Sequence, residues 1–310
     1  MRNKALLTLF AVAAACGGRG DETIGEFGSP PSGWENRRVA FIGDSITDPQ
    51  QTQGQNVYWQ YLAKWMDLDA HVFAACGHRW LEMPGHIRKI YSDMGADVDA
   101  VVILMGTNDY AEGVPLGEWH GLESGDVNWW GKTRRLARRV PNMDTNTFCG
   151  RVNKALSMLK KGWPEAQIIV LTPLKRGYFK CAEDNVQPSE EWPNVSGLRL
   201  EDYVRAIKEG ASLWSCPVID LFAESGFTPT LPDDYAKFCR SRENDMLHPN
   251  SDGHRRLAEL LYFRLRQLPP SFRERRLVQT GDYVLADGWS FRREGESEFR
   301  FVRVPHDWGS

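Results

Sequence analysis

The sequence predicts an α/β fold, a three-layer α/β/α sandwich in which helices cover both faces of a central parallel sheet of five strands. Two observations lead to this prediction. Short runs of apolar, often β-branched residues recur without the alternation typical of a half-exposed sheet, which favours strands buried on both faces. Segments with helical spacing separate these runs, and right-handed crossovers between parallel strands then give a doubly wound sheet.

Each predicted strand is a nearly continuous apolar run. The five runs are residues 39–42, 70–75, 100–105, 167–172 and 217–221. The helices are predicted from apolar residues spaced three and four positions apart. They cover residues 59–66, 147–161, 200–214 and 253–268, and Pro269 and Pro270 end the last of them.

Composition places the chain among ordinary soluble globular proteins. Of its 310 residues, 42% are hydrophobic and 25% are charged. The formal net charge of −3 gives no attraction to nucleic acid or to an anionic membrane, so neither is expected as a partner. The twelve tryptophans favour sugar-stacking surfaces only weakly, because most tryptophans belong to the core.

The N-terminus has the pattern of an export signal. Arg2 and Lys4 precede an apolar stretch, residues 5–15, that is too short to span a bilayer. Because this stretch ends at Cys16 in a pattern that resembles a bacterial lipoprotein site, we expect a signal peptide over residues 1–16 and lipidation of Cys16. The alternative is ordinary cleavage nearby and a free secreted protein.

The remaining chain divides into three predicted parts. Residues 17–36, rich in glycine, proline and serine, are expected to form a flexible tether, and residues 37–270 the main folded domain. Residues 271–310 are a short C-terminal extension. The expected location is outside the cytoplasm, with the protein held by its lipid on a bacterial membrane, in the periplasm or at the cell surface.

Five cysteines remain after the leader. They are Cys76, Cys149, Cys181, Cys216 and Cys239. Their spacing does not match a zinc site, so no metal is predicted, and no disulfide pairing can be deduced from the sequence. Cys76 and Cys216 flank strand-like runs and are interpreted as small buried hydrophobes.

Two long connections do not fit the strand–helix alternation. Residues 110–146 are rich in tryptophan, and their basic run from Lys132 to Arg139 is interpreted as a solvated helix face in preference to an anionic-ligand site. Residues 181–197 form the second connection. Long loops in compact domains are commonly functional, and both are expected at the end of the sheet that carries the site described next.

The segment Gly43-Asp44-Ser45 follows the first strand. It would present a serine hydroxyl at the carboxyl end of a parallel strand, where such sheets place their sites. By itself the motif is better explained by a strand that ends in a polar turn, with Ser45 as the N-cap of the next helix.

Three later segments favour a catalytic interpretation. Gly77 follows the second strand, and Asn108 follows the third, where its amide could donate to an oxyanion. Asp245 precedes His248 by three residues, a spacing that allows the carboxylate to hold the imidazole. Because all four segments follow strands or face the strand ends, we expect them to converge on one site.

These segments together resemble the SGNH hydrolases of the GDSL esterase/lipase superfamily. Gly43–Ile46, Gly77, the stretch Gly106-Thr107-Asn108-Asp109 and the stretch Asp245–His248 match its blocks in order. The likeness covers residues 38–268, and an isoleucine, Ile46, replaces the leucine of the GDSL name.

The resemblance implies a flavodoxin-like sheet and ester hydrolysis through an acyl-enzyme, without a cofactor. Ser45 is the implied nucleophile, with His248 as base and Asp245 as its orienting acid. The backbone amides of Ser45 and Gly77 and the side chain of Asn108 are the implied oxyanion donors.

The substrate is expected to be an acylated carbohydrate. Trp80, Tyr110, Trp129 and Trp130 are candidate sugar-binding residues. Residues 285–308 resemble the opening of family-2 glycoside hydrolases, which suggests a following glycosidase domain in a longer parent protein. The alternatives are a lipase or lysophospholipase for longer acyl esters, and a catalytically idle glycan-binding module.

Overall fold

The computed structural model describes residues 33–51 and 54–268, together with the backbone of four short strands between residues 278 and 303. The predicted leader, Cys16 and most of the tether lie outside the described residues. Trp34 is already buried in the core, so the folded body includes residues that the sequence analysis placed in the tether. In the extension, β12 (Val278–Thr280) pairs with β13 (Tyr283–Leu285), and β14 (Trp289–Glu294) pairs with β15 (Glu298–Arg303).

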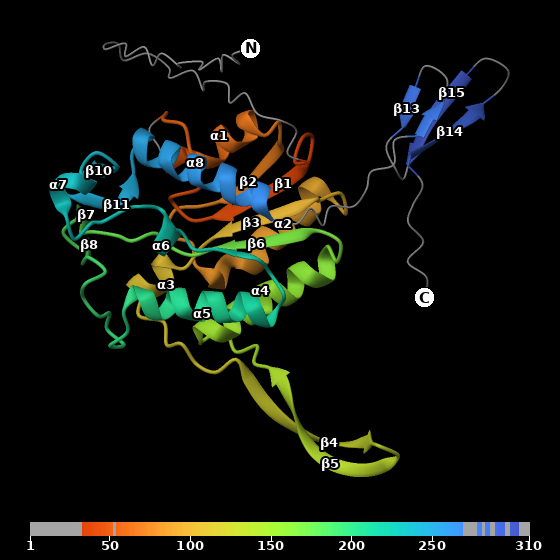
Figure 1. The fold of residues 1–310 in the computed structure, drawn as a ribbon, viewed down its shortest axis with the longest axis horizontal. Helices are drawn as coiled ribbons and strands as arrows, with labels where there is room; N and C mark the ends of the chain where they lie inside the picture. The colour runs from red at the N-terminus through yellow and green to blue at the C-terminus, as the bar shows by residue number, and fades with distance from the viewer. Residues whose placement is uncertain are drawn as a thin grey trace, which may run out of the picture.

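The centre of the molecule is a parallel sheet of five strands, which confirms the predicted fold class (Figure 1). Its strand order is β2-β1-β3-β6-β9. The chain places β2 on one side of β1 and then β3, β6 and β9 on the other side, and this reversal defines a doubly wound sheet. The strands are β1 (Arg38–Gly43), β2 (Asp69–Ala74), β3 (Ala100–Leu104), β6 (Gln167–Leu171) and β9 (Val218–Ile219).

The carboxyl ends of these strands are aligned. One row of Cα partners crosses the sheet and consists of Ala74, Gly43, Leu104, Leu171 and Ile219. The segments that leave the five strands therefore emerge along one edge, where open α/β sheets bind their ligands.

Helices cover the sheet on both sides. The helices of eight residues or more are α1 (Tyr58–Trp65), α2 (Met83–Met94), α4 (Phe148–Gly162), α5 (Leu200–Leu213) and α8 (Ser251–Gln267). The shorter ones are η1 (Pro49–Gln51), η2 (Trp80–Glu82), α3 (Thr107–Ala111), α6 (Leu221–Glu224) and α7 (Pro232–Tyr235). Helix α2 was not predicted from the sequence, although Pro84 stands in its first turn, where a helix tolerates proline.

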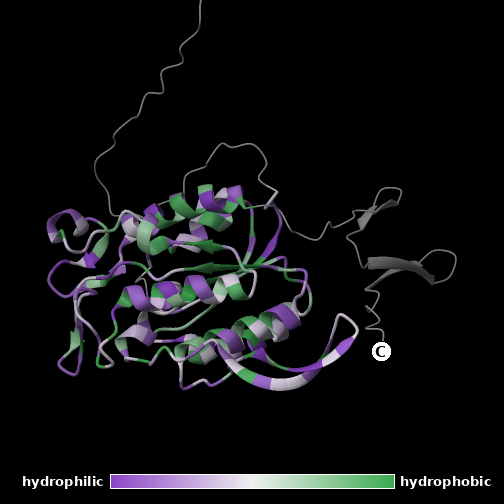
Figure 2. Cartoon of the chain, turned by 60° about the horizontal axis from the view of Figure 1, so that its bottom comes forward, coloured by the Kyte–Doolittle hydropathy of each residue, from purple (hydrophilic) through white to green (hydrophobic). Residues whose placement is uncertain are grey.

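The core consists of two apolar layers, one on each face of the sheet. Alternate β1 residues go to opposite faces: Ala40 and Ile42 pack with α2, α4 and α5, and Phe41 packs with α1 and α8. Figure 2 shows the hydrophobic strands enclosed between helices that carry hydrophilic residues. Within the described residues, no helix is both long enough and apolar enough to cross a membrane.

A second, antiparallel sheet stands beside the carboxyl ends of the parallel strands. Its order is β10-β11-β7-β8. The strands are β7 (Phe179–Ala182), β8 (Asn185–Gln187), β10 (Cys239–Ser241) and β11 (Asp245–Pro249). The segment 181–197, interpreted from the sequence as a long connection, contains β8 and the last two residues of β7.

The basic run Lys132–Arg139 is part of a strand, and its prediction as a helix face is wrong. β4 (His120–Trp129) and β5 (Lys132–Pro141) form a hairpin that projects from the body (Figure 1). The side chains of Lys132 through Arg139 are all exposed, so their predicted solvation is correct. Leu136 and Val140 are four residues apart, and residues at this spacing share one face in a strand as well as in a helix.

Candidate active site

Ser45 lies on the turn that leaves β1. A Cβ at Gly43 would come within 2.0 Å of the Thr47 hydroxyl, so the turn requires glycine at this position. The Asp44 carboxylate accepts the Ile46 backbone N–H at 2.9 Å, and the Asp44 carbonyl accepts the Thr47 N–H at 3.0 Å. The turn is therefore held by its own hydrogen bonds and carries the Ser45 hydroxyl at the strand end.

The hydroxyl of Ser45 meets the imidazole of His248. Ser45 Oγ and His248 Nε2 are 2.9 Å apart, although 203 positions separate the two residues in the chain. On the other side of the ring, His248 Nδ1 is 2.9 Å from Asp245 Oδ1 and 3.0 Å from Oδ2. The three side chains form one continuous hydrogen-bonded series from carboxylate to hydroxyl.

The local structure of β11 fixes Asp245 against His248. Asp245 Oδ1 also accepts the backbone N–H of His248 at 3.0 Å, so one carboxylate holds both the ring and the main chain of the histidine. The Phe179 ring packs against the imidazole in a T-shaped arrangement, with 5.1 Å between the ring centroids. These contacts restrict the imidazole to the orientation that faces Ser45.

Asp245 is held in its charged form. Burial raises the pKa of the carboxyl, but the hydrogen bonds and charge of His248, together with Arg240, lower it by more, and the pKa ends below its ordinary value. A charged Asp245 favours the Nδ1–H tautomer of His248, which leaves Nε2 free to accept a proton from Ser45.

Gly77 and Asn108 are brought together by the loops after β2 and β3. Gly77 has a φ of +76°, a left-handed conformation that glycine adopts without strain. The Asn108 amide donates to the carbonyl of His78, the next residue in that loop, at 2.9 Å. An amide nitrogen has two hydrogens, so a second donor remains on Asn108.

A buried ion pair supports this part of the site, and the sequence analysis did not identify it. Asp109 accepts the Trp80 backbone N–H at 3.0 Å and Arg151 Nη1 at 2.8 Å. Burial raises the pKa of Asp109 to about 6, although the Trp80 N–H and Arg151 oppose the shift. The pair ties α4 to the two loops that carry Gly77 and Asn108.

A second missed residue, Arg176, connects the two halves of the site. Its side chain is fully buried and donates to Thr107 Oγ1 at 3.1 Å and to Gln187 Oε1 at 2.6 Å. The next residue, Gly177, donates its N–H to the Met246 carbonyl at 2.9 Å. Thr107 precedes Asn108 and Met246 follows Asp245, so Arg176 lies between the oxyanion side and the acid–base side.

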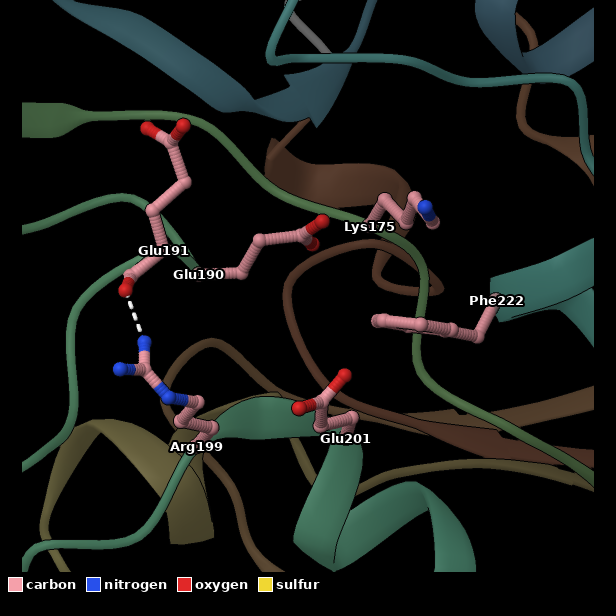
Figure 3. Close-up of a pocket in the computed structure, with 6 residues that line it drawn as sticks. All are labelled: Lys175, Glu190, Glu191, Arg199, Glu201 and Phe222. Atoms are coloured by element: carbon pink, nitrogen blue, oxygen red, sulfur yellow. Dashed lines mark hydrogen bonds between the residues drawn. The ribbon is translucent and has the colours of Figure 1, made fainter.

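A polar cavity of about 320 Å³ lies along the same sheet edge (Figure 3). Its lining consists of Lys175, Glu190, Glu191, Arg199, Glu201 and Phe222. The sequence contained no signal for it, because its residues come from four separate segments. Within the described ranges, no three histidine, cysteine, aspartate or glutamate side chains are grouped as metal ligands.

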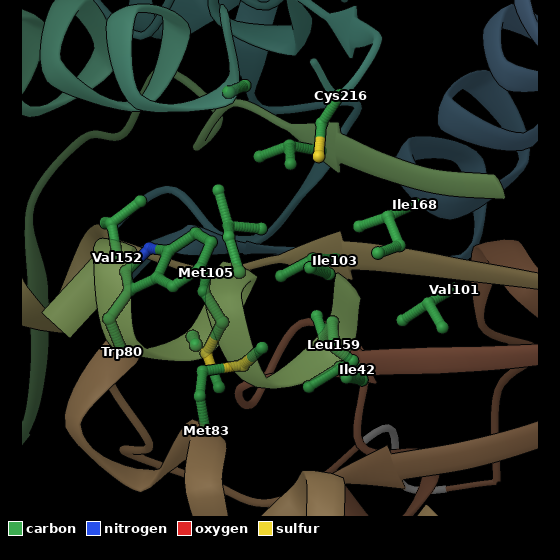
Figure 4. Packing of buried hydrophobic residues seen from close by; sticks show 14 of the residues in the cluster. Ile42, Trp80, Met83, Val101, Ile103, Met105, Val152, Leu159, Ile168 and Cys216 are labelled. Atoms are coloured by element: carbon green, nitrogen blue, oxygen red, sulfur yellow. The ribbon is translucent and has the colours of Figure 1, made fainter. Parts of the chain in front are cut away.

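The structure corrects the sugar-binding assignments. Trp80 is fully buried in the core beside Met83 and Met105 (Figure 4), and Tyr110 is 2% exposed, so neither offers a ring face to a substrate. Trp129 and Trp130 are exposed but belong to the hairpin that projects from the body. Cys216 is buried as predicted, whereas Cys76 is exposed and its prediction as a buried hydrophobe is wrong.

Comparisons with known proteins place this geometry in a family. The model of the GDSL-like lipase/acylhydrolase family matches residues 41–256. One crystal structure, 25% identical in sequence, covers 75% of this chain and 97% of its own with a TM-score of 0.58. No curated protein sequence matches the chain.

Two further solved structures share the fold. A protein from Lactobacillus plantarum is 24% identical and covers 76% of this chain and 99% of its own, with a TM-score of 0.55. A possible lipase from Chitinophaga pinensis is 19% identical and covers 75% and 99%, also with a TM-score of 0.55. The chain therefore belongs to the GDSL-like lipase/acylhydrolase family within the SGNH hydrolase superfamily, and it is a carboxylic ester hydrolase.

Proposed function

We propose that the protein is a serine esterase that removes small acyl groups, acetyl above all, from carbohydrate. The observation that carries this proposal is the series Ser45–His248–Asp245, with 2.9 Å between Ser45 Oγ and His248 Nε2. A hydroxyl bonded to the free nitrogen of an imidazole, which a carboxylate orients from behind, is the arrangement that activates a serine nucleophile.

In the proposed mechanism, Ser45 Oγ attacks the ester carbonyl while His248 Nε2 takes the hydroxyl proton. The Ser45 and Gly77 backbone amides and the Asn108 side chain donate to the oxyanion of the tetrahedral intermediate. His248 then gives the proton to the leaving alcohol, and an acyl-enzyme remains on Ser45. Water, deprotonated by His248, releases the acid and restores the serine.

Two observations support a small acyl group on a polar substrate. Burying a long alkyl chain among charged groups is unfavourable, and the cavity beside the site is lined with charged side chains such as Lys175 and Glu190. The C-terminal residues 285–308 resemble the start of a glycoside hydrolase domain, which favours a carbohydrate partner. The alternatives are a lipase or lysophospholipase and an inactive glycan-binding module.

Export and anchoring belong to the same proposal. Cys16 carries the lipid, and the enzyme acts on the outer side of the cytoplasmic membrane without spanning it. Expression of wild type and Cys16→Ala, followed by detergent phase partition, tests this. We expect only the wild type in the detergent phase, and equal partition of both into water would contradict lipidation.

The test of the activity compares p-nitrophenyl acetate, octanoate and palmitate with wild type and Ser45→Ala. We expect kcat/KM to be highest for acetate and to vanish in the variant. A preference for palmitate would replace the carbohydrate esterase with a lipase. Equal, negligible hydrolysis by both proteins would contradict the esterase and favour the inactive glycan-binding module.

A further inference from the structure

The cavity continues the catalytic edge of the sheet. Ser45 follows β1 and Asn108 follows β3, and the next strands in the sheet are β6 and β9. Lys175 follows β6 by four residues, and Phe222 lies in α6 directly after β9. Neighbouring strands are ~5 Å apart, so β6 and β9 lie two and three strand spacings from β1, a span that a chain-like substrate with its ester at Ser45 can cover.

Polar groups converge in the cavity around one aromatic ring. Figure 3 shows the carboxylates of Glu190 and Glu201 and the ring of Phe222 directed into the same space. The amine of Lys175 lies 5.0 Å from the centre of the Phe222 ring. In the described part of the chain, neither Lys175 nor Glu201 makes an ion pair or a side-chain hydrogen bond.

Glu190 joins the cavity to the catalytic site. Its Oε2 accepts the backbone N–H of Arg176 at 2.7 Å, and its own N–H donates to the Arg176 carbonyl at 3.1 Å. The side chain of Arg176 in turn holds Thr107, the neighbour of Asn108. The wall of the cavity and the oxyanion side of the site are thus fixed by one arginine.

We propose that this cavity binds a second sugar unit of the polysaccharide, and that this unit is neutral. The inference rests on the proposed function and adds the class of carbohydrate that the enzyme accepts. Carboxylates accept hydrogen bonds from sugar hydroxyls, Lys175 donates one, and the Phe222 ring covers an apolar sugar face. Burial raises the pKa of Glu190 to about 7, so above this pH the five charged residues carry one more negative than positive charge, which disfavours a uronic acid. Removing these charged groups from water also disfavours an alkyl chain in the cavity.

The experiment measures two substrates with two variants. The substrates are p-nitrophenyl acetate, which is too small to reach the cavity, and acetylated xylo-oligosaccharides. The test variant is Glu201→Gln, and the matched control is Glu209→Gln, an exposed glutamate of the same helix α5 outside the cavity. We expect Glu201→Gln to lower kcat/KM on the oligosaccharides about tenfold, mainly through KM, and to leave p-nitrophenyl acetate unchanged.

Wild type should also prefer acetylated xylo-oligosaccharides to acetylated oligogalacturonides, and Glu201→Lys should reduce that preference. Unchanged oligosaccharide kinetics in Glu201→Gln would overturn the cavity as a sugar subsite while leaving the esterase intact. An equal loss on both substrates would also overturn it, because the residue would then act on the reaction itself. Wild type that cleaves p-nitrophenyl acetate but no acetylated oligosaccharide would overturn both the carbohydrate substrate and the subsite.

Discussion

The edge of the sheet that carries Ser45 and the β4–β5 hairpin are built in opposite ways. At the edge, polar side chains such as Asp109 and Arg176 are buried and hydrogen-bonded to fixed partners. The hairpin is a ribbon of ten paired residues per strand with most side chains exposed. Catalysis needs groups fixed to a fraction of an ångström, so the comparison predicts large effects at the edge and small ones in the hairpin.

The largest effect is expected for Asp245→Asn. An amide cannot stabilise the imidazolium, and it allows the wrong tautomer of His248, so kcat on p-nitrophenyl acetate should fall ~10³–10⁴-fold. Steady-state kinetics measure this, with thermal unfolding as the control for folding. A loss of less than tenfold would remove Asp245 from the proposed mechanism.

Asn108→Ala should come next. Removal of one oxyanion donor lowers kcat by ~10²–10³, and KM should change little because the donor acts mainly on the transition state. The measurement is kcat and KM on the same ester. An effect confined to KM would mean that Asn108 binds the ground state.

Asp44→Asn tests a buried side chain of the catalytic edge through the pH dependence of the protein's stability. Burial raises the pKa of Asp44 from 3.8 to about 7, so the folded protein binds this proton more tightly than the unfolded chain does. The tighter binding of this proton stabilises the folded state fully below about pH 4, and this stabilisation is lost as the pH rises to about 7. The free energy of unfolding of Asp44→Asn, measured relative to that of wild type, should therefore rise by up to ~4 kcal/mol between pH 4 and pH 8.

Denaturant unfolding of both proteins at the two pH values checks this prediction. The asparagine can still accept the Ile46 N–H, so the turn beside Ser45 keeps its hydrogen bond. Parallel stability curves for the two proteins would show that Asp44 does not titrate between pH 4 and pH 8 in the folded state.

The smallest effect is expected from shortening the hairpin. Glu123 and Arg138 face each other in register, so an Asn-Gly turn can replace residues 124–137 without disturbing the base of the ribbon. We expect kcat/KM on p-nitrophenyl acetate within twofold of wild type and little change in the melting temperature. A hundredfold loss of activity would show that the hairpin takes part in building the site.

The sheet could be predicted because its strands are unbroken apolar runs. All five predicted strands are present, although the fifth is reduced to Val218 and Ile219. The residues of the Ser45–His248–Asp245 series could also be predicted, because a short motif at the end of a strand restricts where its side chain lies. Their convergence on one site was expected as well, and the structure adds the distances between their atoms.

The supporting residues could not be predicted. Arg151 and Arg176 have the sequence character of surface arginines, and only tertiary contacts bury them. The burial of Trp80 is likewise decided by its neighbours and not by its residue type. The hairpin was missed because no apolar alternation marks a strand that is exposed on both faces.

The central claim is that Ser45 is the nucleophile and that His248 activates it, and covalent labelling tests this most directly. A fluorophosphonate loses fluoride when a serine oxygen attacks its phosphorus, and intact-mass and peptide mass spectrometry locate the adduct. We predict one adduct on Ser45 in wild type, none in Ser45→Ala, and labelling slowed by orders of magnitude in His248→Ala. An adduct on another residue, or unchanged labelling in His248→Ala, would contradict the account.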